Sequence, residues 1–169
     1  NYISINTQLL GWVVENATGK KLATYLTEKI WQPLQMEYDA SWSLDSRRHE
    51  TAKAFCCINA RARDFAKFGR LYLNYGQWDG REVVPRDWVE QSTDFQSGRN
   101  GGGYRYQWWR RSGGFETDFY AQGILGQYIY INREKNVIGI RLGKRYGKMG
   151  WVGYIKSMTK NIPKLTPKR

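Results

Sequence analysis

Two glycines three residues apart, Gly123 and Gly126, stand before a stretch that is typical of a β-strand. In that stretch, residues 127–132, tyrosines alternate with isoleucines, so one face carries rings and the other aliphatic groups. Glycine in a strand pattern often marks a bulge or a place where a ligand comes close to the backbone. Backbone N–H groups at such a place can stabilise the oxyanion of a carbonyl under attack. The pattern therefore indicates either an oxyanion site for acyl transfer or a structural β-bulge.

Other catalytic chemistries find little support in the residue types. The chain contains neither a Gly-x-Ser-x-Gly elbow nor a Walker-type phosphate loop. His49 is the single histidine, which leaves little room for a Ser-His-Asp triad. One Ser-x-x-Lys pair occurs, at Ser157 and Lys160, but eight serines and twelve lysines produce such a spacing by chance. Its place on an expected terminal helix puts both side chains toward solvent, so we do not assign it as a catalytic pair.

Cys56 and Cys57 are adjacent in the sequence. A disulfide usually needs a Cα separation of about 4.4–6.8 Å, which one trans peptide does not reach. Two cysteines and a solitary histidine are also too few ligands for a zinc site. We therefore expect two small, unbridged buried side chains.

The composition is that of a globular protein, with 41% hydrophobic and 15% aromatic residues. No apolar run approaches the roughly 20 residues of a membrane span. The net charge of +12 raises the alternative of nucleic-acid binding. Lysine and arginine are spread along the chain rather than gathered in one stripe, so we expect a solvated basic surface and no nucleic-acid partner. No motif calls for a cofactor, and the oligomeric state is left open.

Helical periodicity and capping signals predict helices on both sides of a group of strands. Ser4 or Asn6 could cap the first helix, with Leu9, Leu10, Val13 and Val14 in its buried stripe and Gly19 at its end. The expected helices cover residues 7–18, 21–30, 60–74 and 151–161, with a short helix beginning at Pro85. Asn59 is expected to cap the helix at 60–74. Trp88 and Val89 of the short helix and Met158 of the last helix are expected to face the core.

Four strands are expected at residues 104–110, 117–122, 127–132 and 137–142. The last two flank a polar four-residue turn and predict an antiparallel hairpin. Helices, then strands, then a helix indicate an α+β fold. Residues 98–103 are the best candidate for a boundary between parts.

Several short motifs together resemble one family. Residues 2–11 are similar to the Tyr-x-Asn/Ser box and following helix of the serine β-lactamase and penicillin-binding-protein-like hydrolases, closest to their class C-like branch with the 6-aminohexanoate-dimer hydrolases. Residues 123–127 resemble the strand motif that replaces Lys-Thr-Gly in that branch. Further matching segments are residues 30–34, 59–69, 84–88 and 104–109.

The resemblance implies a C-terminal part of a β-lactamase/transpeptidase-like fold. Residues 1–100 would form the C-terminal portion of the helical subdomain. Residues 101–169 would supply the last antiparallel strands of the α/β subdomain and a packed C-terminal helix. The resemblance favours a periplasmic or secreted location, which the residues themselves leave unknown. The chain begins inside a motif, so we expect a longer parent protein.

The resemblance also implies roles for individual residues. Tyr2 would transfer protons, Ser4 would support it, and Gly123, Ile124, Gly126 and Gln127 would form the oxyanion and substrate strand. The Ser-x-x-Lys nucleophile would lie upstream, so these 169 residues alone should be inactive. The missing Lys-Thr-Gly favours small amide, ester or peptide substrates over β-lactams.

A competing hypothesis is a non-catalytic module that binds glycans or peptides. Eight tryptophans, with Trp108 and Trp109 adjacent, would suit stacking on such ligands. Neighbouring strand residues point to opposite faces, however, so only one of these two rings can face a given ligand.

Overall fold

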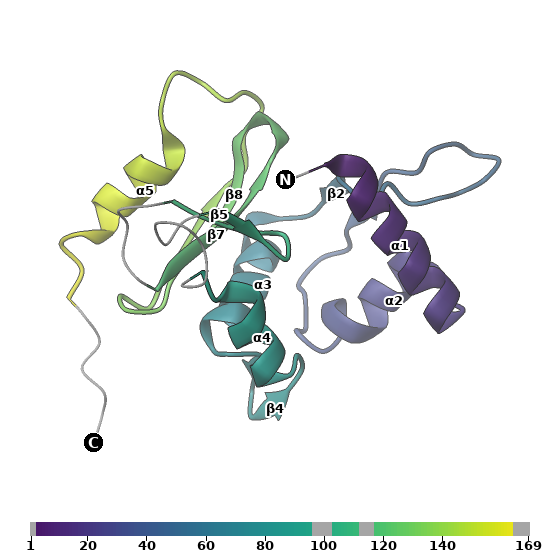
Figure 1. Cartoon of the computed structure of the whole chain (residues 1–169), viewed down its shortest axis with the longest axis horizontal. Helices are drawn as coiled ribbons and strands as arrows, with labels where there is room; N and C mark the ends of the chain where they lie inside the picture. Colours follow the sequence, from purple (N-terminus) through teal and green to yellow (C-terminus); the bar gives the residue numbers. More distant parts are fainter. Residues whose placement is uncertain (1–2, 96–102, 112–116, 164–169) are drawn as a thin grey trace. The chain divides into compact units, whose positions relative to one another are not determined.

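The computed structural model describes residues 3–95, 103–111 and 117–163 (Figure 1). Two compact units divide the chain, Asn1–Asp64 and Phe65–Arg169. Helices and antiparallel strands occur together, which confirms the α+β class. The expected boundary near residue 100 concerns subdomains of the whole family fold and stays a prediction.

The first unit begins with helix α1, Ser4–Thr18. Gly19 ends it in the left-handed conformation (φ 66°), and its N–H donates to the Glu15 carbonyl at 2.8 Å. The helix starts about one turn earlier than expected. Ile3 occupies the N-cap position, so Ser4 lies within the first turn and Asn6 caps nothing.

The buried side of α1 differs from the expected apolar stripe. Gln8 is buried, and its side chain donates to the Ala52 carbonyl and accepts from the Ala54 N–H at 3.1 and 3.0 Å. Gly11 lets the loop approach, because a Cβ there would lie 2.6 Å from the Ala54 Cβ. Leu9, Leu10 and Val13 are instead about half exposed. The side of α1 that packs against the loop at residues 52–54 therefore carries Gln8 and Gly11 rather than the aliphatic residues.

The rest of this unit is short helical turns and a small β-ladder. α2 covers Leu22–Leu26 and runs into a π-helical turn, η1, Thr27–Trp31. Strand β1, Ser41–Trp42, pairs antiparallel with β2, Ile58–Asn59.

The expectation of unbridged cysteines is wrong, because Cys56 and Cys57 form a disulfide. Their Cα atoms are 3.7 Å apart, below the usual range for bridged cysteines, and Cys57 takes a left-handed conformation (φ 76°). The Trp42 indole N–H donates to the carbonyls of Lys53 and Cys56. The bridged turn is thereby joined to the β1–β2 ladder.

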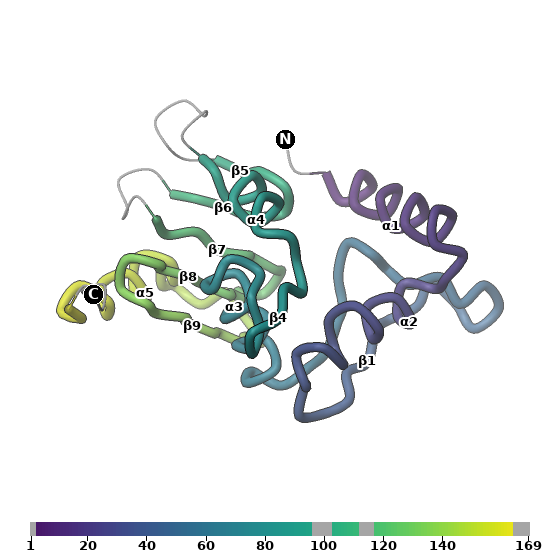
Figure 2. Tube along the Cα trace, turned by 90° about the horizontal axis from the view of Figure 1, so that it is seen from below, coloured from purple at the N-terminus to yellow at the C-terminus, as the bar shows by residue number. Residues whose placement is uncertain are grey.

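The described part of the second unit contains an antiparallel sheet of five strands in the order β5-β6-β7-β8-β9 (Figure 2). The predicted hairpin is confirmed, with Asn132 opposite Val137 across the turn. The predicted strand 104–110 is in fact two strands, because Tyr106 and Gln107 adopt positive φ and reverse the chain. The strands are β5 Gly103–Arg105, β6 Trp108–Arg110, β7 Asp118–Gly123, β8 Gln127–Asn132 and β9 Val137–Arg141.

Helices cover both faces of this sheet (Figure 1). On the face bearing Tyr128 and Tyr130, α5, Trp151–Thr159, packs with Val152 and Ile155. The opposite face packs against α3, Ala62–Leu73, and α4, Arg86–Thr93; its core consists of Tyr72, Val89, Phe95, Trp108, Phe119 and Ile131. The alternation of rings and aliphatic groups in β8 therefore faces two separate cores.

The connection from α3 to α4 follows the local sequence signals closely. Strands β3, Gln77–Trp78, and β4, Arg81–Glu82, flank Asp79 and Gly80, both with positive φ, as an Asp-Gly hairpin requires. Asn59, however, lies in β2 and not at the start of α3.

The sequence predicted less well the exact start of α4 and which side chains of α4 and α5 face the core. Pro85 is the N-cap of α4 rather than its first residue. Val89 is fully buried, but Trp88 is 41% exposed. Met158 of α5 is 54% exposed, while Thr159 is buried in its place. No helix among the described residues is long and apolar enough to cross a membrane.

Candidate active site

An exposed turn joins β7 to β8 at the glycines that the sequence pattern selected. Gly123 ends β7 opposite Gln127, and a 3-10 turn, η3, spans Ile124–Gly126 between them. Leu125 (φ 60°) and Gly126 (φ 83°) both adopt left-handed conformations. Ile124 is 65% exposed. Turns of this kind direct successive backbone N–H groups into a small concavity that suits negative charge.

The side chain of Gln127 fixes the base of this turn. Its amide nitrogen donates to the Gly143 carbonyl at 2.5 Å, and its oxygen accepts from the Gly143 N–H at 2.8 Å. The segment after β9 is thereby held beside the turn. Gln127 is thus placed to support the turn, whereas Ile124 and Gly126 form it.

The two residues assigned to proton transfer lie elsewhere in the chain. Tyr2 is outside the described residues. Ser4 is exposed in the first turn of α1, in the other compact unit. The structure brings Gly123, Ile124, Gly126 and Gln127 together, and their combination with Tyr2 and Ser4 remains a proposal.

Tyrosines of the sheet are poor candidates for the base. Burial raises the pKa of the Tyr120 and Tyr128 hydroxyls, and near Tyr128 the Arg141 charge only partly opposes this. Burial likewise raises the pKa of Tyr130, whose hydroxyl donates to the Asp118 carboxylate at 3.0 Å. A phenol that resists ionisation cannot take a proton from a serine near neutral pH. These three tyrosines therefore serve the core.

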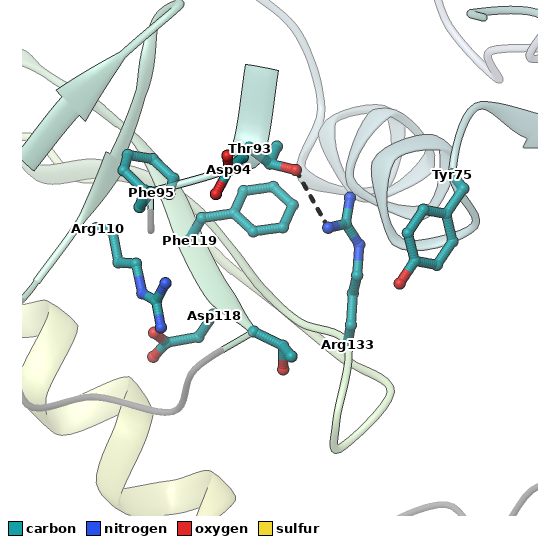
Figure 3. A pocket seen from close by; sticks show the side chains of 9 residues that line it. Tyr75, Thr93, Asp94, Phe95, Arg110, Asp118, Phe119 and Arg133 are labelled. Atoms are coloured by element: carbon teal, nitrogen blue, oxygen red, sulfur yellow. Dashed lines mark hydrogen bonds between the residues drawn. The ribbon is translucent and has the colours of Figure 1, made fainter. Parts of the chain in front are cut away.

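A small pocket of about 120 Å³ lies at the opposite end of β7, around Phe119 and Arg133 (Figure 3). Arg133 donates to the Thr93 hydroxyl at 3.1 Å and the Tyr72 carbonyl at 3.0 Å, and its guanidinium lies over the rings of Tyr75 and Phe119. Burial lowers the pKa of this guanidinium.

Arg133 and Asp118, two charged side chains that line this pocket, both have partners within the protein. Asp118, almost fully buried, accepts from Tyr130 and pairs with Lys156 at 2.9 Å. Asp118 and Gly123 are five residue steps apart along β7, or about 17 Å at the usual rise per residue. The pocket is therefore remote from the exposed turn, and we treat it as a polar part of the core. The described residues hold no group of acidic, His or Cys side chains suited to a metal ion.

Sequence reasoning missed Arg141 at the end of β9. Its guanidinium reaches the carbonyls of the exposed turn. The available signal was a single charge near the end of the otherwise apolar stretch of residues 137–142. An arginine at a strand end is common, so the sequence did not reveal what this side chain contacts.

Comparison with known proteins identifies the family. The beta-lactamase family model matches residues 1–150. A 6-aminohexanoate-dimer hydrolase from Paenarthrobacter ureafaciens is 30% identical over 152 residues, which cover 83% of this chain and 38% of the relative.

Solved structures agree with this assignment. A protein from Bacillus anthracis described as a 6-aminohexanoate-dimer hydrolase superposes with a TM-score of 0.82 at 27% identity, covering 94% of this chain and 42% of that one. A beta-lactamase structure from Mycobacterium bovis shares the fold, with a TM-score of 0.67, 17% identity, and coverage of 94% of this chain and 61% of that one. This chain spans well under half the length of the two 6-aminohexanoate-dimer hydrolases. It belongs to the beta-lactamase family.

Proposed function

We propose that the protein, at its natural length, is a serine hydrolase that cleaves an amide or ester bond through an acyl-enzyme. The observation that carries the proposal is the 30% identity to a 6-aminohexanoate-dimer hydrolase, over most of this chain. The exposed turn at Ile124–Gly126 supports the proposal, because backbone N–H groups there would be accessible to a substrate oxygen. The nucleophile would belong to a Ser-x-x-Lys motif upstream of Tyr2.

The chemistry assigns each group one task. The serine oxygen attacks the substrate carbonyl carbon while its proton passes to a base, because an unassisted hydroxyl is a weak nucleophile. The carbonyl electrons move to oxygen, and backbone N–H groups of the turn, that of Ile124 above all, stabilise this oxyanion.

Collapse of the tetrahedral intermediate breaks the bond to the leaving amine or alcohol, which receives the proton. Water then attacks the acyl-enzyme in the same manner and releases the acid. Tyr2 would carry the proton in both halves, and Ser4 would support it.

The substrate is proposed to be a small amide, ester or peptide. Residues 123–126 read Gly-Ile-Leu-Gly, so the turn itself offers apolar side chains and no charge. Ile124 and Leu125 are 65% and 43% exposed and would contact the aliphatic part of a substrate. A short aliphatic amide of the 6-aminohexanoate kind fits this chemistry.

The alternative of an aromatic binding module gains no support from Trp42 or from Trp108, the ring that the adjacent pair 108–109 turns into the core. Trp108 is 4% exposed and packs against Tyr72 and Phe119 in the core. The Trp42 indole is tied to the Lys53 and Cys56 carbonyls. These rings are used within the fold rather than presented to a ligand.

The proposal is tested with the protein at its natural length, using nitrophenyl esters and 6-aminohexanoate oligomers. Replacing Tyr2 by Phe should lower kcat by roughly 10²–10⁴-fold, the usual contribution of a positioned acid or base. Tyr38→Phe is the matched control, since that side chain is 44% exposed and should leave the rate unchanged. Full activity of Tyr2→Phe would remove the role of Tyr2. Absence of any acyl transfer by the unaltered protein would overturn the function.

A further inference from the structure

We infer that Arg141 is a positioning residue for acyl transfer, holding the Ile124–Gly126 turn in the conformation that presents its N–H groups to the substrate oxygen. This inference rests on the proposed function. Arg141 lies at the end of β9, opposite Tyr128 of β8, and its side chain extends along the sheet to the turn.

The guanidinium contacts backbone on two sides. One terminal nitrogen, Nη1, donates to the carbonyls of Leu125 (3.3 Å) and Gly126, and the other, Nη2, donates to the Arg145 carbonyl at 3.1 Å. The guanidinium lies over the Trp151 ring, with Cζ 3.8 Å from the ring centroid. Three carbonyls and an aromatic ring therefore fix one side chain.

The glycines around Arg141 show that the space is shaped for it. A Cβ at Gly126 would lie 2.5 Å from Nη1 of Arg141, and a Cβ at Gly143 would lie 1.9 Å from the same atom. Any larger residue at either position would displace the guanidinium. Gln127 adds a second tie by hydrogen bonding to the backbone of Gly143.

These contacts orient two peptide groups of the turn, those that begin with the Leu125 and Gly126 carbonyls. A peptide group is planar, so a carbonyl and the N–H that follows it point in opposite directions. Because the Leu125 and Gly126 carbonyls turn toward Arg141, the N–H groups of Gly126 and Gln127 turn away from it, and Arg141 acts on the Ile124 N–H through the backbone of the turn. The pairing of Gly123 with Gln127 fixes the other end of the turn, so Ile124 lies between two anchored points.

Two left-handed residues in succession make this support necessary. Leu125 has a φ of 60°, which costs a residue with a Cβ roughly 1–2 kcal/mol. Without a partner for its carbonyl, the peptide after Leu125 would gain by rotating to a more favourable conformation. A cation bound to the turn opposes that rotation, and its charge also favours the developing oxyanion.

The test compares three variants of the natural-length protein. Arg141→Ala should lower kcat by about 10–100-fold while KM changes by less than about threefold, because an oxyanion contact strengthens mainly in the transition state. Arg141→Lys should not restore the rate, since a single ammonium nitrogen cannot reproduce the contacts of two separate guanidinium nitrogens or the stacking on Trp151. Arg145→Ala is the control, because it removes the same charge but keeps the backbone carbonyl that Arg141 contacts.

Chemical rescue separates positioning from simple stability. Methylguanidine should restore part of the kcat of Arg141→Ala, and methylammonium should not. Hydrolysis by the unaltered protein with an unchanged kcat in Arg141→Ala would overturn this inference alone. So would a loss of kcat that follows the loss of melting temperature and is not rescued. If the unaltered protein hydrolyses none of the substrates, the proposed function fails and this inference fails with it.

Discussion

At several turns the backbone conformation decides which residue a position accepts. Gly76 and Gly80 both have φ near 80°, a region that costs residues with a Cβ roughly 1–2 kcal/mol. Their surroundings differ, however. A Cβ at Gly80 would meet nothing within 4 Å, whereas a Cβ at Gly76 would lie 1.9 Å from the Val84 carbonyl oxygen. The Gly76 carbonyl also accepts the N–H groups of Val83 and Val84.

This difference predicts unequal effects of the same substitution. Gly80→Ala should lower the free energy of unfolding by about 1–2 kcal/mol through backbone strain. Gly76→Ala should cost roughly 1–3 kcal/mol more, because the crowded backbone must also move. Urea denaturation of the two variants beside the parent measures both losses. Equal losses would show that the close approach of Val84 relaxes without penalty.

At the scale of elements, α5 is joined to the sheet by charge as well as by apolar packing. Lys156 of α5 pairs with Asp118 at the start of β7 at 2.9 Å, and the two side chains are 13% and 1% exposed. Tyr130 donates to the same carboxylate oxygen. The carboxylate is therefore acceptable in the core only while both partners are in place.

Removing the cation alone should be more harmful than removing the pair. Lys156→Met should cost about 3–5 kcal/mol in the free energy of unfolding, because it leaves a buried, uncompensated carboxylate. Adding Asp118→Asn to that variant should recover part of the loss. Lys160→Met, at an exposed position after the same helix, is the control and should stay within about 0.5 kcal/mol of the parent. A loss in Lys156→Met no larger than in the control would contradict a stabilising role for the pair.

Local sequence patterns predicted which segments form helices, strands and turns better than they predicted which side chains of those segments are buried. The β8–β9 hairpin and the Asp79–Gly80 turn were found because alternation and turn residues act over a few positions. The split of residues 104–110 was missed because Tyr106 and Gln107 are ordinary strand residues that tertiary context forces to positive φ. Helical periodicity identified the apolar positions of α1, but it could not show that Gln8 and Gly11 are the residues that pack against the loop at residues 52–54.

For the candidate site, too, the sequence predicted the local segment but not its contacts with distant residues. Glycine spacing and the family resemblance selected residues 123–127, and the structure shows an exposed turn there. The contacts of Arg141 could not be read from the sequence, because they depend on which strands become neighbours. The roles of Tyr2 and Ser4 rest on the resemblance and stay predictions.

At the scale of the whole molecule, net charge and exposed apolar surface act in opposite directions. A charge of +12 keeps copies of the chain apart at low ionic strength. Helix α1 presents Ile5, Leu9 and Val13, four residues apart on one face and 49–62% exposed, with Leu10 beside them. Contiguous apolar surface of this kind is a site of association.

The 169-residue chain expressed alone should therefore self-associate, and more strongly as salt is added. At about 0.1 M salt the Debye length falls to roughly 10 Å, so charge repulsion weakens while apolar attraction persists. Leu9→Glu combined with Val13→Glu should reduce association, whereas Ala23→Glu with Thr24→Glu adds the same charge at exposed positions of α2, outside the apolar face of α1, and should reduce it less. Sedimentation velocity at low and high salt measures the effect. Equal behaviour of the two double variants would mean that net charge alone, and not the apolar face of α1, governs association.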